Sequence, residues 1–183
     1  MPIILGTQCD SRSSFMAWSD QIIQGLKDAD ISLVAYVPDG ITWRILGKME
    51  DDPFFHMIPC SREEEAIGII SGAYTAGKRG TVFMQSSGFG NCINALATLN
   101  IPSRIPFPMF IGMRGGPGEF NMAQIPGARA VPGILDSLGL QYFSLTREDE
   151  LDQIIKGGIA LCYAGRLPVA NLLSTLLTGG RDA

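Results

Sequence analysis

The stretch TVFMQSSGFGN, residues 81–91, decides the fold class. Its first part, Thr81 to Gln85, is a short apolar run typical of a buried strand. The serines and glycines that follow predict a tight turn into a helix. In open α/β sheets, a junction of this kind faces ligands and favours anions. On turn chemistry alone, a structural turn and a ligand-binding loop are equally good interpretations.

Short apolar runs and amphipathic segments alternate on both sides of this stretch. We expect further strands over residues 31–37, 54–59, 108–112, 142–143 and 169–173. We expect helices over residues 15–26, 41–49, 61–77, 131–138 and 148–164. This alternation predicts an α/β fold, with a mostly parallel sheet and helices on both faces in a single three-layer domain over residues 13–178. Residues 1–12 are expected to form an irregular N-terminal arm.

The composition limits the kinds of partner. The chain has 183 residues, of which 46% are hydrophobic and 17% charged, with a mean hydropathy of +0.19. Such an apolar chain is expected to cover part of its surface with a partner. The net charge of −4 and the pI near 4.9 argue against nucleic acid and against anionic membranes as partners.

The cysteines and the N-terminus point to a reduced, cytoplasmic protein. Cys9, Cys60, Cys92 and Cys162 lie far apart and show neither a CxxC pair nor zinc-ligand spacing, so no metal-ligand set is expected within the chain. The first residues lack the pattern of a signal peptide. No apolar run approaches the roughly 20 residues that cross a bilayer.

Glu63 stands out because it occupies the buried stripe of its predicted helix. At 100° per residue, Ile67, Ile70 and Tyr74 lie within about 40° of it around the helix axis. A carboxylate in such a stripe is costly unless something pairs with it. Glu63 is therefore a candidate site residue on position alone.

The other charged candidates have structural alternatives. Glu64 completes a Ser-x-x-Glu capping box with Ser61, and Glu65 falls on the solvated face. Asp39 either caps the helix that follows it or faces the site. Arg114 lies in a glycine-rich loop and suits a carboxylate, sulfonate or phosphonate, although an exposed loop arginine is the simpler interpretation.

Several common active sites are excluded. Ile93 stands where the dinucleotide fingerprint needs glycine, and neither a phosphate-binding loop nor a GxSxG elbow is present. The single histidine, His56, lies in a predicted strand, roughly 13 Å from Cys60 at ~3.3 Å per residue. That separation excludes a local Cys-His pair.

Three segments together carry a family resemblance. Residues 61–66, 72–78 and 84–91 resemble the pyrimidine-binding domain of thiamin diphosphate enzymes. Within that superfamily the chain is most similar to the alpha subunit of sulfopyruvate decarboxylase and to the matching half of phosphonopyruvate decarboxylase. The match covers roughly residues 14–175, and its motifs follow in order at residues 37–39, 62–66, 85–91, 114–115 and 124–126.

The resemblance implies roles for particular residues. A glutamate at the position of Glu63 hydrogen-bonds N1′ of the cofactor's aminopyrimidine, which promotes proton removal from thiazolium C2 and so the decarboxylation of a 2-oxo acid. Asp39 is implied as a second proton-transfer residue, and Arg114 and Gln124 as ligands of the substrate's acidic tail. The implied lining of the pyrimidine pocket is Gln85, Ser86, Ser87, Gly88, Phe89, Gly90 and Asn91.

The resemblance also implies a missing half. Thiamin diphosphate enzymes hold the diphosphate through Mg²⁺ with a Gly-Asp-Gly motif, which this chain lacks. A second subunit would supply that domain, making a hetero-oligomer with the active site between the chains.

Departures from the family pattern leave the substrate open. The run from Phe120 to Gln124 differs from the acidic run of the phosphonopyruvate relatives, Met113 replaces a more polar residue, and the stretch Phe107–Met113 is apolar. A less charged or aromatic 2-oxo acid, or carboligation, therefore remains open. The alternatives are a non-catalytic α/β binding or regulatory module and, disfavoured by the broken glycine fingerprints, a nucleotide-binding protein.

Overall fold

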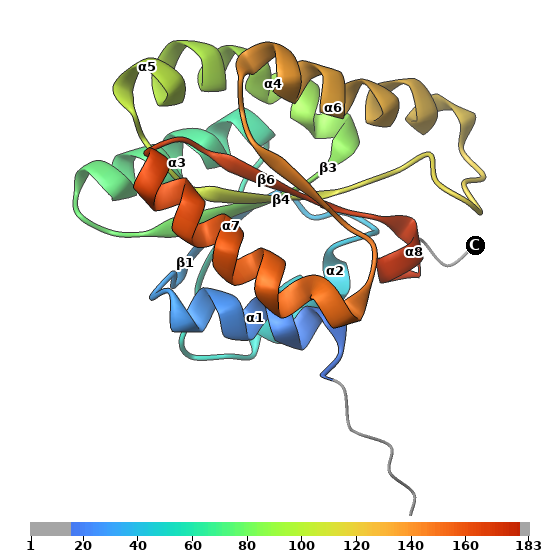
Figure 1. The fold of residues 1–183 in the computed structure, drawn as a ribbon, viewed down its shortest axis with the longest axis horizontal. Helices are drawn as coiled ribbons and strands as arrows, with labels where there is room; N and C mark the ends of the chain where they lie inside the picture. The colour runs from blue at the N-terminus through green and yellow to red at the C-terminus, as the bar shows by residue number, and fades with distance from the viewer. Residues whose placement is uncertain (1–15, 180–183) are drawn as a thin grey trace, which may run out of the picture.

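The computed structural model describes residues 16–179, which build one six-stranded sheet with every neighbouring pair parallel (Figure 1). The strand order is β2-β1-β3-β4-β6-β5. The strands are β1 (Leu33–Tyr36), β2 (His56–Pro59), β3 (Gly80–Gln85), β4 (Pro108–Gly112), β5 (Tyr142–Leu145) and β6 (Val169–Leu173). The predicted N-terminal arm, residues 1–12, lies outside the described residues.

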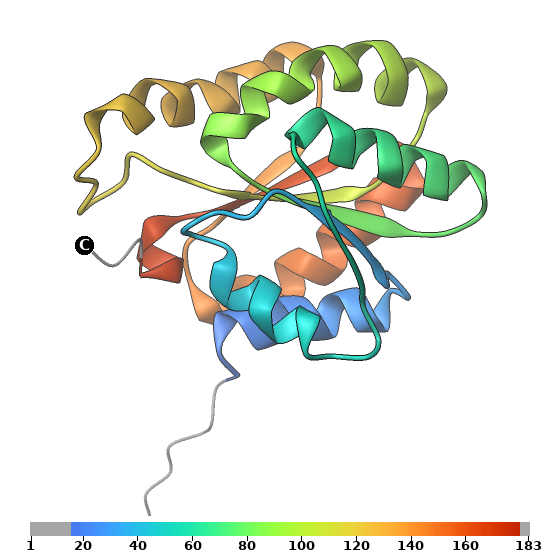
Figure 2. The same ribbon diagram turned by 180° about the vertical axis from the view of Figure 1, so that it is seen from behind.

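Helices cover both faces of the sheet, as predicted (Figures 1 and 2). One face carries α1 (Trp18–Asp28), α2 (Trp43–Glu50) and α7 (Leu151–Gly165). The other carries α3 (Glu63–Thr75), α4 (Ser86–Ala95) and α6 (Ile125–Leu138). The shorter helical segments are η1 (Leu96–Asn100), α5 (Ile101–Ser103), η2 (Met122–Gln124), η3 (Glu148–Glu150) and α8 (Thr175–Thr178). The α/β class with a parallel sheet is confirmed.

The strands supply side chains alternately to two apolar layers. In β3, Phe83 points into the layer under α1, α2 and α7, whereas Val82 and Met84 point into the layer under α3, α4 and α6. Phe83 stacks on Phe110 of β4 with ring centroids 4.7 Å apart. Burial on both faces explains why these strands read as continuous apolar runs.

Two predicted helix starts are wrong. α4 begins at Ser86, directly after β3, so residues 86–91 form its first turns and not a separate turn. α6 begins at Ile125, not at 131, because Pro126 occupies its first turn, where a missing N–H costs nothing.

The predicted capping box at the start of α3 does not form. Arg62 is the N-cap residue and makes no side-chain cap hydrogen bond. The backbone N–H of Ser61 donates instead to Glu65 Oε2 at 2.8 Å, one residue beyond the predicted Glu64. Glu64 pairs with the Arg62 guanidinium at 3.3 Å.

The strand order places a reversal of the winding near the middle of the sheet. From β1 the chain moves outward to β2, then returns past β1 to β3, so the winding reverses between β1 and β3. Open α/β sheets bind ligands at such a reversal, outside the carboxyl ends of the strands. Gln85 pairs with Gly112, and Gly112 with Leu173, which sets three strand ends level. No helix within residues 16–179 is long and apolar enough to span a membrane.

Candidate functional site

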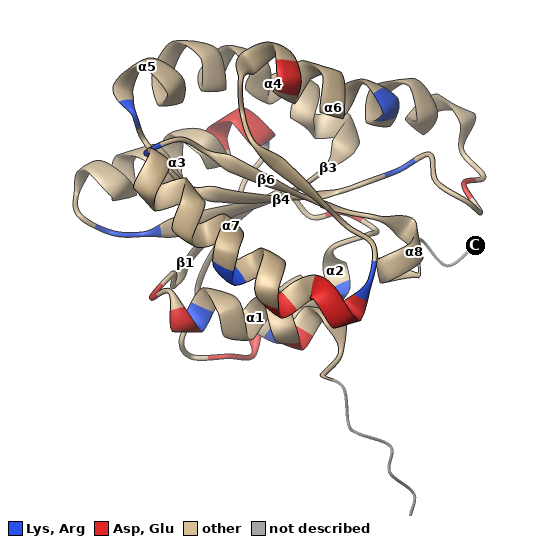
Figure 3. Cartoon of the chain, in the orientation of Figure 1, with Lys and Arg blue, Asp and Glu red and all other residues tan. Residues whose placement is uncertain are grey.

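The carboxyl edge gathers the predicted site residues. The loop after β1, the starts of α3 and α4, and the loop from β4 to α6 all lie there. Figure 3 shows the acidic residues that open α3 as one block at the start of that helix. Unpaired N–H groups at helix starts make this edge receptive to acidic and polar ligand groups.

Glu63 lies half-buried against the first turns of α4. Its Oε2 accepts a hydrogen bond from Asn91 Nδ2 at 3.1 Å. Gly88 is the residue that makes room for it, since a Cβ there would lie 1.9 Å from Glu63 Oε1. Among the hydrogen bonds of the described residues, Oε1 has none, so one oxygen of this carboxylate is available to a ligand.

Asp39 acts as a cap for the turn that leads into α2. Its Oδ1 accepts the backbone N–H groups of Ile41 at 2.6 Å and Thr42 at 3.1 Å. Its Oδ2 accepts the Thr42 hydroxyl. Of the two alternatives that the sequence left open, capping or facing the site, the structure shows the cap. A catalytic role for Asp39 stays a prediction.

Arg114 is buried, which the sequence did not predict. Its Nε and Nη2 donate to the carboxylate of Glu119 at 2.7 Å and 2.6 Å, and its Nη1 donates to Gln85 Oε1 at 3.2 Å. The backbone N–H of Arg114 donates to the hydroxyl of Ser86 at 3.2 Å. All three side-chain nitrogens are therefore engaged inside the protein.

Gln85, the last residue of β3, contacts both predicted substrate residues, Arg114 and Gln124, which lie in the connection from β4 to α6. Its Nε2 donates to Ser87 Oγ at 2.7 Å and to Gln124 Oε1 at 3.3 Å. The structure thus brings Gln85, Arg114 and Gln124 together, although 39 positions separate the two glutamines in sequence.

The predicted pocket residues 85–91 fall into two groups. Phe89 is fully buried in the apolar layer, so its side chain belongs to the core and not to a pocket wall. Ser87, Gly90 and Asn91 are exposed. The alternation follows from the helix that these residues form, because one face of α4 packs on the sheet.

Glu119 is the site residue that the sequence analysis missed. The Arg114 guanidinium, together with the backbone N–H groups of Asn121 and Gly115, holds the pKa of its carboxyl at about 2, well below the usual range. Gly115 and Gly118 adopt φ of +77° and +84°, which bends the loop so that Glu119 returns to Arg114. An Arg-Gly-Gly-Pro-Gly-Glu run was the available signal, but its spacing alone does not show that the loop closes.

The apolar stretch before this loop is packing. Phe107, Phe110 and Ile111 are fully buried in the two layers around the sheet. The apolar character of residues 107–112 therefore reflects the position of β4, whereas Met113, directly after the strand, is half-buried.

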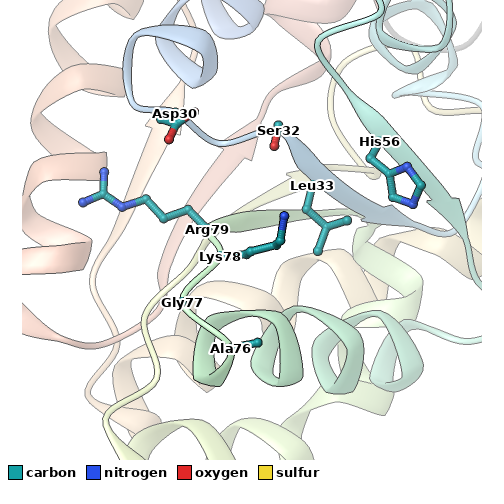
Figure 4. Close-up of a pocket in the computed structure, with 8 residues that line it drawn as sticks. All are labelled: Asp30, Ser32, Leu33, His56, Ala76, Gly77, Lys78 and Arg79. Atoms are coloured by element: carbon teal, nitrogen blue, oxygen red, sulfur yellow. The ribbon is translucent and has the colours of Figure 1, made fainter.

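A hollow lies at the opposite, amino edge of the sheet (Figure 4). Lys78 and Leu33 lie close together there, whereas Arg79 extends away from His56. Arg79 donates to the backbone carbonyl of Ala29 at 3.0 Å. α3 ends at this edge and directs its terminal carbonyls there, so the cations complement a helix C-terminus.

Residues 16–179 offer neither a cluster of metal ligands nor a cysteine with a lowered pKa. Residues 16–179 contain no group of three or more His, Cys, Asp or Glu placed to hold a metal ion. Burial raises the pKa of the Cys60 thiol and raises that of Cys162 to about 12. These thiols stay protonated and packed.

Apolar side chains are exposed around the same edge as Glu63. Trp43, Phe120, Met122 and Leu176 are 56%, 57%, 74% and 70% exposed. Each belongs to a segment that follows the carboxyl end of β1, β4 or β6.

Known proteins similar to this chain were found in two of three comparisons. No family model matches the sequence. The chain is 37% identical to a sulfopyruvate decarboxylase subunit alpha from Methanocaldococcus jannaschii over 161 residues, which are 88% of this chain and 95% of the relative. It is 34% identical to a sulfopyruvate decarboxylase from Methanosarcina acetivorans over 132 residues, 72% of this chain but 34% of that protein. It is 32% identical to a phosphonopyruvate decarboxylase from Streptomyces viridochromogenes over 109 residues, 60% of this chain and 28% of that protein.

Among solved structures, the fold is similar to part of a 2-oxoglutarate:ferredoxin oxidoreductase from Magnetococcus marinus. The TM-score is 0.68 at 15% identity, over 89% of this chain and 29% of that one. At this identity the likeness shows the fold alone. Two sulfopyruvate decarboxylase alpha subunits, 35% and 37% identical and matched over 95% of their length, show that the chain belongs to the family of these subunits, which are carboxy-lyases.

Proposed function

We propose that this chain is the pyrimidine-domain subunit of a two-chain, thiamin diphosphate-dependent decarboxylase of sulfopyruvate or a similar 2-oxo acid. The observation that carries the proposal is the Glu63 carboxylate, held against Gly88 and Asn91 at the carboxyl edge with one oxygen available.

The residues present fit an aminopyrimidine. An aminopyrimidine needs a carboxylate that can share a proton with its ring nitrogen, and Gly88 leaves the space in which the Glu63 carboxylate lies at the start of α4. Gln85, Ser87 and Asn91 surround the same helix start with amide and hydroxyl groups. When bound, thiamin diphosphate supplies a carbon nucleophile for the 2-oxo group and takes up the electrons that decarboxylation releases.

The chain's own residues then hold the aminopyrimidine and orient the substrate. Glu63 shares a proton with the pyrimidine ring nitrogen through Oε1, and Asn91 fixes the rotamer of that carboxylate through Oε2. Gln124 contacts the substrate, and Arg114, in the same connection from β4 to α6, supports Gln124 through Gln85. Asp39 remains a candidate for proton transfer.

Several observations support a second subunit that holds Mg²⁺ and the diphosphate. The chain lacks a Gly-Asp-Gly motif. A relative described simply as sulfopyruvate decarboxylase is about three times as long as the matched part, which leaves room for a second domain in one chain. The exposed apolar residues around the site, Trp43, Phe120, Met122 and Leu176, suit burial by such a partner.

The test is Glu63→Gln in the complex isolated through a tag on this chain. The substituted amide keeps the shape of the side chain and can still contact Asn91, but it cannot share a proton, so decarboxylation should fall about 10²–10⁴-fold. Glu65→Gln, in the same helix turn but on the exposed face, is the matched control and should keep the wild-type rate. A Glu63→Gln rate within a few-fold of wild type would remove Glu63 from this role.

A further inference from the structure

Glu119 is the most completely satisfied carboxylate at the site edge. It accepts Arg114 Nε and Nη2 at 2.7 Å and 2.6 Å, and the backbone N–H groups of Gly115 and Asn121 at 3.1 Å and 2.9 Å. The Arg114 and Glu119 side chains are only 3% and 4% exposed. A buried, bidentate pair with further hydrogen bonds is a fixed unit, unlike a mobile surface ion pair.

One path of contacts leads from Glu119 through Arg114 to the glutamines. Arg114 Nη1 donates to Gln85 Oε1 at 3.2 Å. Gln85 Nε2 in turn donates to Gln124 Oε1 at 3.3 Å.

A second path reaches Gln124 along the loop. Glu119 Oε1 accepts the N–H of Asn121, and Asn121 Oδ1 accepts the N–H of Ala123 at 3.1 Å. That cap starts the short helix η2, which ends at Gln124. The two paths close a ring that begins and ends at Glu119.

The ring fixes the direction of each amide. An arginine only donates hydrogen bonds, so Gln85 must turn its oxygen toward Arg114 and its nitrogen toward Gln124. Gln124 therefore accepts through Oε1 and turns Nε2 out of the ring. Within the described part of the chain, Nε2 has no hydrogen-bond partner, so it can donate to a carboxylate or keto oxygen of a 2-oxo acid.

The same contacts keep Arg114 from gripping a substrate anion. A sulfonate would have to displace Glu119, which holds its place through four hydrogen bonds. Glu119 also neutralises the guanidinium charge at close range.

We propose that Glu119 is a positioning residue: through Arg114 and Gln85 it turns the donor end of Gln124 toward the substrate, and Arg114 does not contact the acidic tail. This inference rests on the proposed function, because it assigns a task to residues of that same site. It assigns substrate contact to Gln124 and positioning to Glu119 and Arg114.

The kinetic test uses the complex isolated through a tag on this chain, with sulfopyruvate and pyruvate as substrates that differ in the acidic tail. Glu119→Gln should lower kcat/KM about tenfold for both substrates, with their ratio unchanged within about threefold. Gln124→Glu should raise KM for both, because a carboxylate still accepts from Gln85 but repels the substrate carboxylate. Asp149→Asn is the control, because it removes a bidentate ion pair with Arg147 that is exposed and lies in a different loop. It should leave kcat/KM unchanged for both substrates.

A change of more than about tenfold in the ratio of the two kcat/KM values would overturn the proposal. A lower KM for sulfopyruvate in Glu119→Gln would do so most clearly, since it would mean that Arg114, released from Glu119, binds the acidic tail. The double variant Arg114→Met with Glu119→Met guards against misfolding, because it leaves no unpaired buried charge. This double variant should lower kcat/KM by the same factor for both substrates. A loss of kcat/KM confined to sulfopyruvate would contradict the proposal.

A readout without chemistry separates this inference from the proposed function. In the full chain, Glu119→Gln should move the side-chain amide NMR signals of Gln85 and Gln124, while Asp149→Asn should not. If the amide signals of Gln85 and Gln124 do not move in Glu119→Gln, the proposed ring of hydrogen bonds is wrong, even if the enzyme is active. A wild-type complex that decarboxylates no 2-oxo acid would refute the proposed function, whereas moved signals would still support the ring.

Discussion

At the scale of single residues, the site depends on which groups are left available. Within residues 16–179, one oxygen of Glu63 has no hydrogen-bond partner, whereas Asp39 and Glu119 use both oxygens for hydrogen bonds within their own loops. The type of residue is the same in all three cases, an acid at the carboxyl edge, but only Glu63 has the geometry of a ligand-facing group.

Gly88→Ala tests the packing of Glu63 directly. A Cβ at this position would lie 1.9 Å from Glu63 Oε1, so the carboxylate must move. We expect decarboxylation by the complex to fall at least about tenfold while the chain stays folded, since alanine favours a helix over glycine. Gly68→Ala, in exposed space on α3, is the control and should keep the rate. Equal rates for the two variants would argue against a positioned Glu63.

Asp39→Asn separates the cap from a proton-transfer role. The turn should weaken by about 0.5–1 kcal/mol in the free energy of unfolding, because asparagine keeps one accepting oxygen for the N–H groups of Ile41 and Thr42. The cap alone predicts a turnover number within a few-fold of wild type. A loss of about 10² or more at saturating substrate would assign Asp39 a catalytic role.

At the scale of elements, the strands were the most predictable part. The expected strand at 169–173 matches β6, Val169–Leu173, because a strand buried on both faces leaves a continuous apolar run in the sequence. The start of α6 was not predictable from periodicity, because its first turn carries Pro126 and mostly exposed residues. The Glu119 ring was not predictable either, since it depends on the left-handed backbone of Gly115 and Gly118 and on contacts across 29 and 39 positions.

The loop from β4 to α6 should lose stability in acid through Glu119. Its pKa is about 2 in the folded chain and ordinarily 4.5, so the folded state binds this proton more weakly than the unfolded state. The stabilisation is therefore fully present above pH 4.5 and is lost as the pH falls from there toward 2. Urea unfolding across that window should show the difference between wild type and Glu119→Gln shrinking with falling pH. A difference that stays constant would contradict the assigned pKa.

At the scale of the whole molecule, we propose that the site is one wall of a pocket that a second subunit completes. The chain supplies an acid, amides and an exposed apolar rim at one edge of the sheet, but it has no Gly-Asp-Gly motif for a metal-bound diphosphate. The isolated chain should therefore fail to bind thiamin diphosphate with micromolar affinity in the presence of Mg²⁺. Titration calorimetry of the purified chain measures this, and tight binding would refute the two-chain arrangement.

The most direct measurement is to isolate the native complex through a tag on this chain and to assay it for bound thiamin diphosphate. We expect the complex to contain a second chain and thiamin diphosphate, and to retain both when it is isolated in a buffer that contains Mg²⁺. A clean single chain that holds no cofactor, even with Mg²⁺ and thiamin diphosphate added, would contradict it and would favour a non-catalytic binding module.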